Sequence, residues 1–146
     1  MSSVSVNEAV DGALLLLGGR LRQGGVRLIR HKAPDAVVMA DRFRLEQVIV
    51  NLIQNALEAL EDIPNPAVTL SVKQIGSQVE LIVADNGPGL SEAIRDQLFT
   101  PFVTSKANGL GLGLVISRDI IAAFKGELNL RPSDVGAVFV ITLRSV

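Results

Sequence analysis

The sequence predicts an α/β fold of two layers, in which three helices cover one face of a mixed, largely antiparallel sheet of about five or more strands. Apolar residues recur at helical spacing in segments 4–23, 42–60 and 111–124. Segments 67–85 and 127–145 each contain two alternating runs separated by a short turn, as in hairpins. A doubly wound parallel sheet fits this order poorly, because its consecutive strands need helical crossovers.

The first part of the chain is expected to hold one helix and two strands. Residues 4–23 form the helix, which the glycine pair at 24–25 ends. Residues 26–32 alternate as a strand does, and Pro34 interrupts that pattern. Residues 36–40 then form a short apolar run, which is typical of a buried strand.

Segment 42–60 has the clearest helical pattern. Asp41 suits the N-cap, because its side chain can accept hydrogen bonds from the first free amides of a helix. A turn at 61–66 follows the helix. The apolar stripe of the helix consists of Leu45, Val48, Ile49, Leu52, Ile53, Ala56 and Leu60.

The second half is expected to alternate hairpins with helices. Residues 67–75 and 78–85 form two strands that meet at a turn over 76–77. A short helix at 91–97 and an irregular segment at 98–110 come next. The remaining expected elements are a helix at 111–124 and closing strands at 127–132 and 136–145.

Composition and charge exclude several classes of function. The length of 146 residues predicts one domain over residues 1–146, and a net charge of −1 with interspersed signs argues against a nucleic-acid partner. The absence of cysteine excludes disulfides and thiolate metal sites, and the single histidine, His31, argues against a multi-histidine site. The apolar run at 13–19 is far shorter than the ~20 residues of a membrane span, so we expect a cytoplasmic domain that is not membrane-embedded.

A polar row lies along one side of the predicted helix 42–60. Gln47, Asn51, Asn55 and Glu58 follow one another at spacings that place them on a single face. The row is either a solvated surface or a set of oxygen ligands and donors that face a polar cofactor. In the second case a carboxamide oxygen could help to complete the octahedral shell of Mg²⁺.

Asp85 ends a predicted strand and begins a glycine-containing loop. A carboxylate in that position needs hydrogen-bond donors, and the exocyclic amine of adenine could be one of them. Gly87 and Gly89 flank Pro88, and their missing side chains would let a flat base approach the backbone. The alternative is an ordinary turn that Asp85 caps.

Alternate glycines precede the last predicted helix. Gly109, Gly111 and Gly113 would expose backbone amides at a helix N-terminus, which favours phosphate, and Lys106 could add a full positive charge. The alternative is a flexible loop with a frayed helix start. Neither the dinucleotide fingerprint nor the P-loop motif is present in this segment.

Taken together, four segments resemble the nucleotide-binding boxes of the GHKL superfamily, which groups gyrase, Hsp90, histidine kinases and MutL. Residues 46–60 resemble the N box, 85–90 the G1 box, 98–106 the F box and 109–121 the G2 box. The branch that they resemble is the catalytic ATP-binding domain of bacterial sensor histidine kinases. Within this branch, the segment TPFVTSK (residues 100–106) is similar to the corresponding segment of the nitrogen- and C4-dicarboxylate-sensing kinases.

The resemblance implies a Mg²⁺-ATP site with particular roles. Asn55 would give its side-chain oxygen to Mg²⁺, and Asn51 would contact phosphate or support the metal shell. Asp85 would accept a hydrogen bond from the adenine amine, with Gly89 beside the base. The implied cofactor-binding residues are Asn51, Asn55, Glu58, Asp85, Gly87, Gly89, Thr104, Lys106, Gly109, Gly111, Leu112 and Gly113.

The F box resemblance implies a mobile lid, anchored by Phe99 and Phe102, that orders when nucleotide binds. Two positions depart from the family pattern. Leu110 stands where a small residue usually follows the first glycine of the G2 box, and Ala137 follows Gly136 where threonine is common. A water-bridged contact to adenine is therefore absent or is supplied differently.

Position 51 favours a kinase over a hydrolase. The hydrolases of the superfamily carry a glutamate one helical turn before the metal asparagine, whereas this chain has Asn51, and an amide cannot act as a general base. The expected partner is the dimerisation domain that carries the phosphoacceptor histidine, with a response regulator involved indirectly. His31 is followed by Lys32, not by an acidic residue, so it does not match the acceptor.

The chain is therefore expected to be the catalytic part of a longer sensor that does not phosphorylate itself alone. Two alternatives stay open: a stand-alone serine kinase of the anti-sigma-factor type, and a non-catalytic nucleotide-binding module. The leucine run 14–17 is wider than one helical stripe, so it either faces an absent helical domain or packs fully into the core.

Overall fold

The computed structural model describes residues 1–99 and 113–146. The elements are β1 (Ser2–Ser5), α1 (Val6–Gln23), β2 (Arg27–His31), β3 (Val37–Ala40), α2 (Arg42–Ala59), β4 (Ala67–Ile75), β5 (Gln78–Asp85), α3 (Glu92–Asp96), α4 (Gly113–Ala123), β6 (Glu127–Arg131) and β7 (Val138–Arg144).

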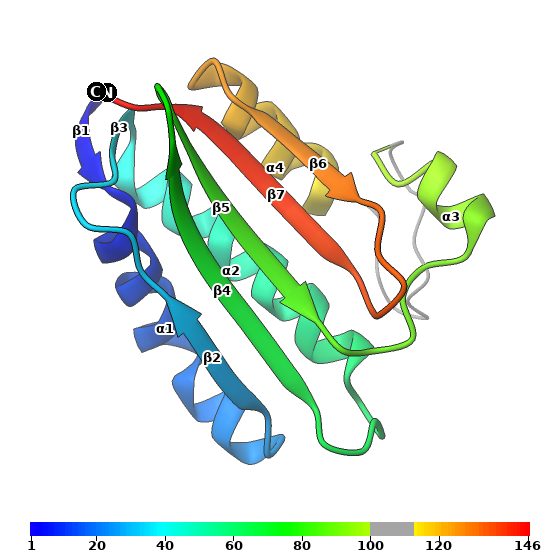
Figure 1. The fold of residues 1–146 in the computed structure, drawn as a ribbon. Helices are drawn as coiled ribbons and strands as arrows, with labels where there is room; N and C mark the ends of the chain where they lie inside the picture. The colour runs from blue at the N-terminus through cyan, green and yellow to red at the C-terminus, as the bar shows by residue number, and fades with distance from the viewer. Residues whose placement is uncertain (100–112) are drawn as a thin grey trace.

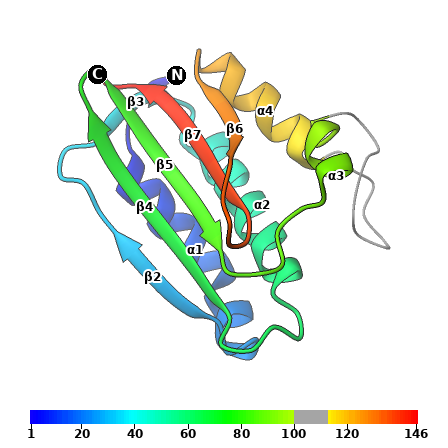
Figure 2. The ribbon, with the colours of Figure 1, turned by 45° about the vertical axis from the view of Figure 1, so that its right-hand side comes forward.

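The principal sheet has five strands in the order β2-β4-β5-β7-β6. Only β2 and β4 run parallel, and the other neighbours pair antiparallel. Helices α1, α2 and α4 lie on one face of this sheet, while α3 lies beyond the end of β6 (Figures 1 and 2). The predicted two-layer fold with a mixed, largely antiparallel sheet is confirmed.

The core lies between the sheet and the helices. The predicted stripe of α2 is buried, and Leu45, Ile49 and Ile53 are inaccessible to solvent. Asp41 caps this helix as expected, because its side chain accepts a hydrogen bond from the amide of Arg44 at 3.1 Å. The predicted hairpin is also present, with Ile75 opposite Gln78 across the two-residue turn.

The start of the first helix differs from the prediction. Residues 2–5 form β1, which pairs antiparallel with β3 in a separate two-stranded sheet. Val4 is buried opposite Val38, so strand pairing captures a residue that local spacing assigned to the helix. The helix begins at Val6 because the Ser5 side chain accepts a hydrogen bond from the amide of Glu8 and caps it.

The leucine run of α1 divides between core and surface. Leu17 is buried, with 3% of its surface exposed, whereas Leu15 and Leu16 are 87% and 72% exposed. Full packing of the run into the core is therefore wrong. The helix buries one stripe and presents the two middle leucines outward.

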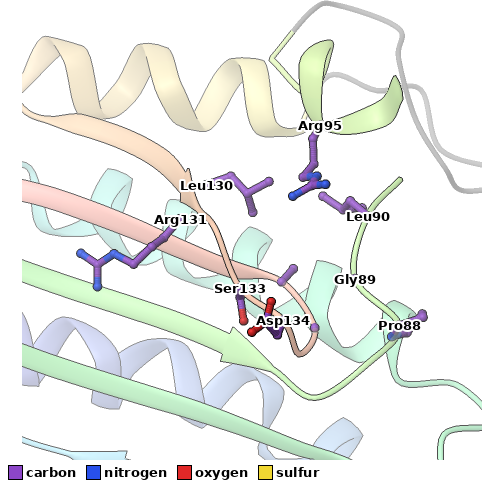
Figure 3. Close-up of a pocket in the computed structure, with 10 residues that line it drawn as sticks. Pro88, Gly89, Leu90, Arg95, Leu130, Arg131, Ser133 and Asp134 are labelled. Carbon is purple, nitrogen blue, oxygen red and sulfur yellow. The ribbon is translucent and has the colours of Figure 1, made fainter. Parts of the chain in front are cut away.

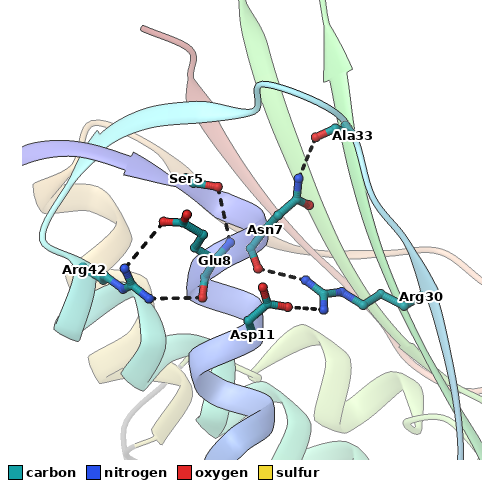
Figure 4. Close-up of polar contacts among 7 residues, drawn as sticks. All are labelled: Ser5, Asn7, Glu8, Asp11, Arg30, Ala33 and Arg42. Atoms are coloured by element: carbon teal, nitrogen blue, oxygen red, sulfur yellow. Dashed lines mark hydrogen bonds and ion pairs between the residues drawn. The ribbon is translucent and has the colours of Figure 1, made fainter.

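Polar contacts join the first turns of α1 to both of its neighbours (Figure 4). Arg30 on β2 forms an ion pair with Asp11 and donates a hydrogen bond to the backbone carbonyl of Asn7 at 2.8 Å. On the other side of the helix, Arg42 of α2 forms an ion pair with Glu8 at 3.6 Å. These contacts fix the start of α1 against β2 on one side and against the start of α2 on the other.

Candidate functional site

The polar row of α2 faces the beginning of α4. Asn51 is half-buried, and its Nδ2 donates a hydrogen bond to Ser117 Oγ at 3.2 Å. A Cβ atom added to Gly113 would lie 2.6 Å from Asn51 Oδ1, which is closer than real Cβ contacts allow. The structure therefore brings the predicted residues Asn51 and Gly113 together, and a side chain at position 113 would displace the Asn51 carboxamide.

The other members of the row lie along the same helix. Asn55 is half-buried one turn after Asn51, and Glu58 is exposed in the last turn of α2. Both residues have an interaction partner within the fold. Their spacing of three residues keeps them on one side of the helix, as the sequence predicted.

Asp85 ends β5 as a buried carboxylate, with 8% of its surface exposed. Its Oδ1 accepts hydrogen bonds from the amides of Gly87 at 2.9 Å and Ala137 at 3.4 Å. Burial raises the pKa of Asp85 above its ordinary value of 3.8, and the two amide hydrogen bonds oppose that rise. Loss of hydration is the larger effect, so a ligand that donates to this carboxylate would relieve an existing desolvation penalty.

Glycines surround Asp85 because no side chain fits there. A Cβ atom on Gly87 would lie 2.9 Å from the carbonyl oxygen of Ala59, so this bare residue lets the loop after β5 touch the last turn of α2. Gly89 has φ +77°, and its missing Cβ would lie 3.1 Å from the carbonyl oxygen of Gly136. The space that these two glycines leave is thus used by close contacts within the fold, and the approach of a base to this backbone stays a prediction.

From the sequence, Gly136 was expected beside the closing strand and, by the family resemblance, near the adenine contact, but its packing against Asp85 was not predicted. It has φ +62°, and an added Cβ would lie 1.9 Å from the backbone oxygen of Asp85. The β6–β7 turn thus packs directly on the end of β5 and brings the Ala137 amide to the carboxylate. The available signal was the glycine directly before the closing strand, but its partner lies about 50 residues earlier in the chain.

A small cavity of about 90 Å³ lies beside Gly89 (Figure 3). Its walls come from the loop after β5, from α3 and from the β6–β7 turn, and they include Arg95 and Asp134. Neither Asp85 nor Asn55 lines it. This cavity therefore adjoins the predicted nucleotide site without being the whole of it.

Several predicted site residues lie outside the described residues, in segment 100–112. These are Thr104, Lys106, Gly109, Gly111 and Leu112, together with the predicted lid residue Phe102.

The other predicted lid residue, Phe99, is described. It is half-buried and packs against the hydrophobic core. The guanidinium carbon of Arg118 on α4 lies 4.6 Å from the centre of the Phe99 ring, which is a cation–π contact. Phe99 is thus anchored to α4 as well as to the core.

The oxygen donors on the polar side of α2 suit a metal ion that is already bound to the phosphates of a nucleotide. Within residues 1–99 and 113–146, no cluster of three or more His, Cys, Asp or Glu side chains could hold a metal ion. A neutral carboxamide such as Asn55 fits Mg²⁺ that is held mainly by phosphates and water.

In the described ranges 1–99 and 113–146, no helix is long and apolar enough to cross a membrane.

Comparison with known proteins identifies relatives of this fold. The family model for histidine kinase-, DNA gyrase B-, and HSP90-like ATPases matches residues 40–146. The C4-dicarboxylate transport sensor protein DctB of Rhizobium meliloti (strain 1021) is 41% identical over 143 residues, which cover 96% of this chain and 23% of DctB.

Solved structures agree with this result. The catalytic domain of histidine kinase ThkA superposes with a TM-score of 0.88 at 29% identity, and the match covers 99% of this chain and 95% of that domain. ThkA in complex with the response regulator protein TrrA gives a TM-score of 0.85 at 27% identity, covering 99% of this chain and 42% of that one. These relatives favour the sensor-kinase expectation over the anti-sigma-factor alternative. The chain spans less than a quarter of the length of DctB.

Proposed function

Because this chain belongs to the family of histidine kinase-, DNA gyrase B- and HSP90-like ATPases, we propose that it binds Mg²⁺-ATP and presents the γ-phosphate to a histidine of a separate domain. The nucleotide would lie between the polar side of α2, the loop after β5 and the first turn of α4. Asn55 lies on α2, Asp85 ends β5 directly before this loop, and Gly113 begins α4.

The observation that carries the proposal is the setting of Asp85. Two backbone amides hold Oδ1, so the other carboxylate oxygen is the one we assign to the adenine amine. Gly87 brings this loop against α2, one helical turn beyond Asn55. A base bound at Asp85 would therefore place its phosphates along the asparagine row.

The metal role falls to Asn55, whose carboxamide oxygen would complete the shell of a Mg²⁺ ion that the phosphates bind. When bound, the ion would neutralise phosphate charge during transfer. Lys106 and the amides of Gly109, Gly111 and Gly113 would hold the phosphates. Phosphoryl transfer needs mainly this alignment and charge stabilisation from the protein.

The chain is proposed to be a kinase domain rather than a hydrolase. Asn51 has no basic group, and its amide nitrogen is engaged by Ser117. His31 lies on β2, at the opposite edge of the sheet from β6, against which α4 packs. The attacking imidazole would thus come from a dimerisation domain of the same cytoplasmic signalling protein, and a response regulator would receive the phosphoryl group later.

Calorimetric titration tests the binding step. The parent chain should bind ATP more tightly with Mg²⁺ than in EDTA, and Asn55→Ala should lose most of that difference. Gln74→Ala, which removes an exposed carboxamide on β4 away from these three elements, is the matched control and should bind as the parent does. No detectable binding by the folded parent at millimolar ATP and Mg²⁺ would refute the proposal.

A transfer assay tests the kinase step. The chain is mixed with γ-labelled ATP and a separate helical-hairpin domain that carries an acceptor histidine. Label should appear on that domain, not on this chain, and His31→Ala should transfer normally. Dependence of labelling on His31, or steady ATP hydrolysis at about 1 per second or faster, would contradict the assignment.

A further inference from the structure

Ser117 is a buried polar residue that has no role in the nucleotide site as proposed above. It lies on α4, one turn after Gly113, and only 3% of its surface is exposed. Its hydroxyl oxygen accepts the 3.2 Å hydrogen bond from Asn51 Nδ2, across 66 positions of sequence. The pair links α4 to the polar row of α2 at the level of the first helical turn of α4.

We propose that Ser117 is a positioning residue for Asn51 and fixes the orientation of its carboxamide. A carboxamide can rotate by half a turn with little change in shape, so its neighbours decide where oxygen and nitrogen lie. Ser117 Oγ accepts the hydrogen bond from the nitrogen, and Oδ1 then lies next to the place that a Cβ of residue 113 would take. This inference rests on the proposed nucleotide function.

The other neighbour of the carboxamide favours the same orientation. Gly113 is the first residue of α4, and a helix N-terminus carries partial positive charge. An oxygen is more stable there than an NH₂ group. The helix terminus therefore selects the orientation with the oxygen towards it, the serine hydroxyl holds the nitrogen in that orientation, and the bare α-carbon leaves room for the oxygen.

The orientation separates the two roles that Asn51 could have. A carboxamide nitrogen would donate a hydrogen bond to phosphate, whereas the oxygen can only accept. With its nitrogen donating to Ser117, Asn51 offers its oxygen as an acceptor, and water molecules on Mg²⁺ are donors that this oxygen would suit, whereas Lys106 and the glycine amides would serve the phosphates. Ser117 thereby supports binding of the metal-nucleotide complex rather than of the bare nucleotide.

Ser117→Ala tests this assignment. Affinity for a non-hydrolysable ATP analogue is measured across Mg²⁺ concentrations and in EDTA. We expect the variant to bind the Mg²⁺ complex roughly 3- to 10-fold more weakly, as for loss of one neutral hydrogen bond. Its affinity in EDTA should match that of the parent. Equal weakening in both conditions, or no change in either, would overturn the inference.

A double-mutant comparison separates positioning from packing. In an Asn51→Asp background both terminal atoms are oxygens, so no orientation remains to be selected. Ser117→Ala should then have no additional effect on the Mg²⁺ dependence, and an undiminished effect would contradict the role. If Ser117→Ala does not fold, Ser117→Cys keeps the size and weakens the acceptor, so the same comparison is made with it. Failure of the parent itself to bind nucleotide would instead refute the proposed function.

Discussion

Gly136→Ala should both destabilise the fold and impair the nucleotide site. The glycine belongs to the β6–β7 turn, has φ +62° and packs on the backbone of Asp85. A methyl group there would lie 1.9 Å from the Asp85 carbonyl oxygen, so one of the two segments must move by roughly 1 Å to reach an ordinary contact. Such a shift would also pull the Ala137 amide away from the carboxylate, since their hydrogen bond is already 3.4 Å long.

The expected size follows from two separate penalties. The left-handed backbone costs a residue other than glycine about 1–2 kcal/mol. Forced repacking against backbone atoms costs about 1–3 kcal/mol more. Gly136→Ala should therefore lower the free energy of unfolding by about 2–5 kcal/mol, which corresponds to a fall in midpoint temperature of roughly 6–15 °C for a domain of this size.

Gly76→Ala provides the matched control. Gly76 also has positive φ, +58°, but an added Cβ would meet no atom within 4 Å. Only the backbone penalty applies, so its midpoint should fall by roughly 3–6 °C. Thermal unfolding followed by circular dichroism measures both variants, and an ATP titration should show weaker binding only for Gly136→Ala. Equal losses of stability, or parental ATP affinity in Gly136→Ala, would refute the steric argument.

The remaining predictions concern Asp85 and Arg118. Asp85→Asn should leave the unfolding midpoint at pH 7 unchanged or raise it, because the amide keeps an acceptor for both backbone donors and removes a buried charge. Its ATP affinity should fall roughly 10- to 150-fold, and a lowered midpoint would contradict the reasoning. The raised pKa means that the folded protein retains the Asp85 proton to a higher pH than the unfolded chain. The stability contribution of Asp85 therefore decreases as pH rises from 3.8 through the raised pKa. If Asp85→Asn unfolds at a higher temperature than the parent at pH 7, this difference should shrink as the pH is lowered. A difference that grows on acidification would mean that the pKa of Asp85 is lowered in the folded protein, not raised. Arg118→Ala should lower the free energy of unfolding by about 0.5–1 kcal/mol in urea titrations. Arg118→Lys should retain part of that energy. In a Phe99→Leu background, Arg118→Ala should cause no further loss, and an undiminished loss would show that the contact with Phe99 does not stabilise the fold.

Local sequence patterns were sufficient for most elements. The stripe and N-cap of α2, the β4–β5 hairpin and the β6–β7 pair follow from spacing and turn residues within each segment. The start of α1 was misplaced because Val4 finds its strand partner in β3, more than 30 residues later. The same limit applies to the parallel pairing of β2 with β4, which α2 and β3 separate in sequence.

The candidate site likewise has features that the local sequence predicts and features that depend on distant parts of the chain. The sequence by itself determined which chemical groups are available: the asparagines of α2, the carboxylate at the end of β5 and the glycine at the start of α4. Only the tertiary structure decided that Gly136 packs on Asp85 and that Ser117 holds the nitrogen of Asn51. Periodicity and capping report on neighbours within a few residues, whereas these contacts depend on how the turn and the helices pack against elements distant in the chain.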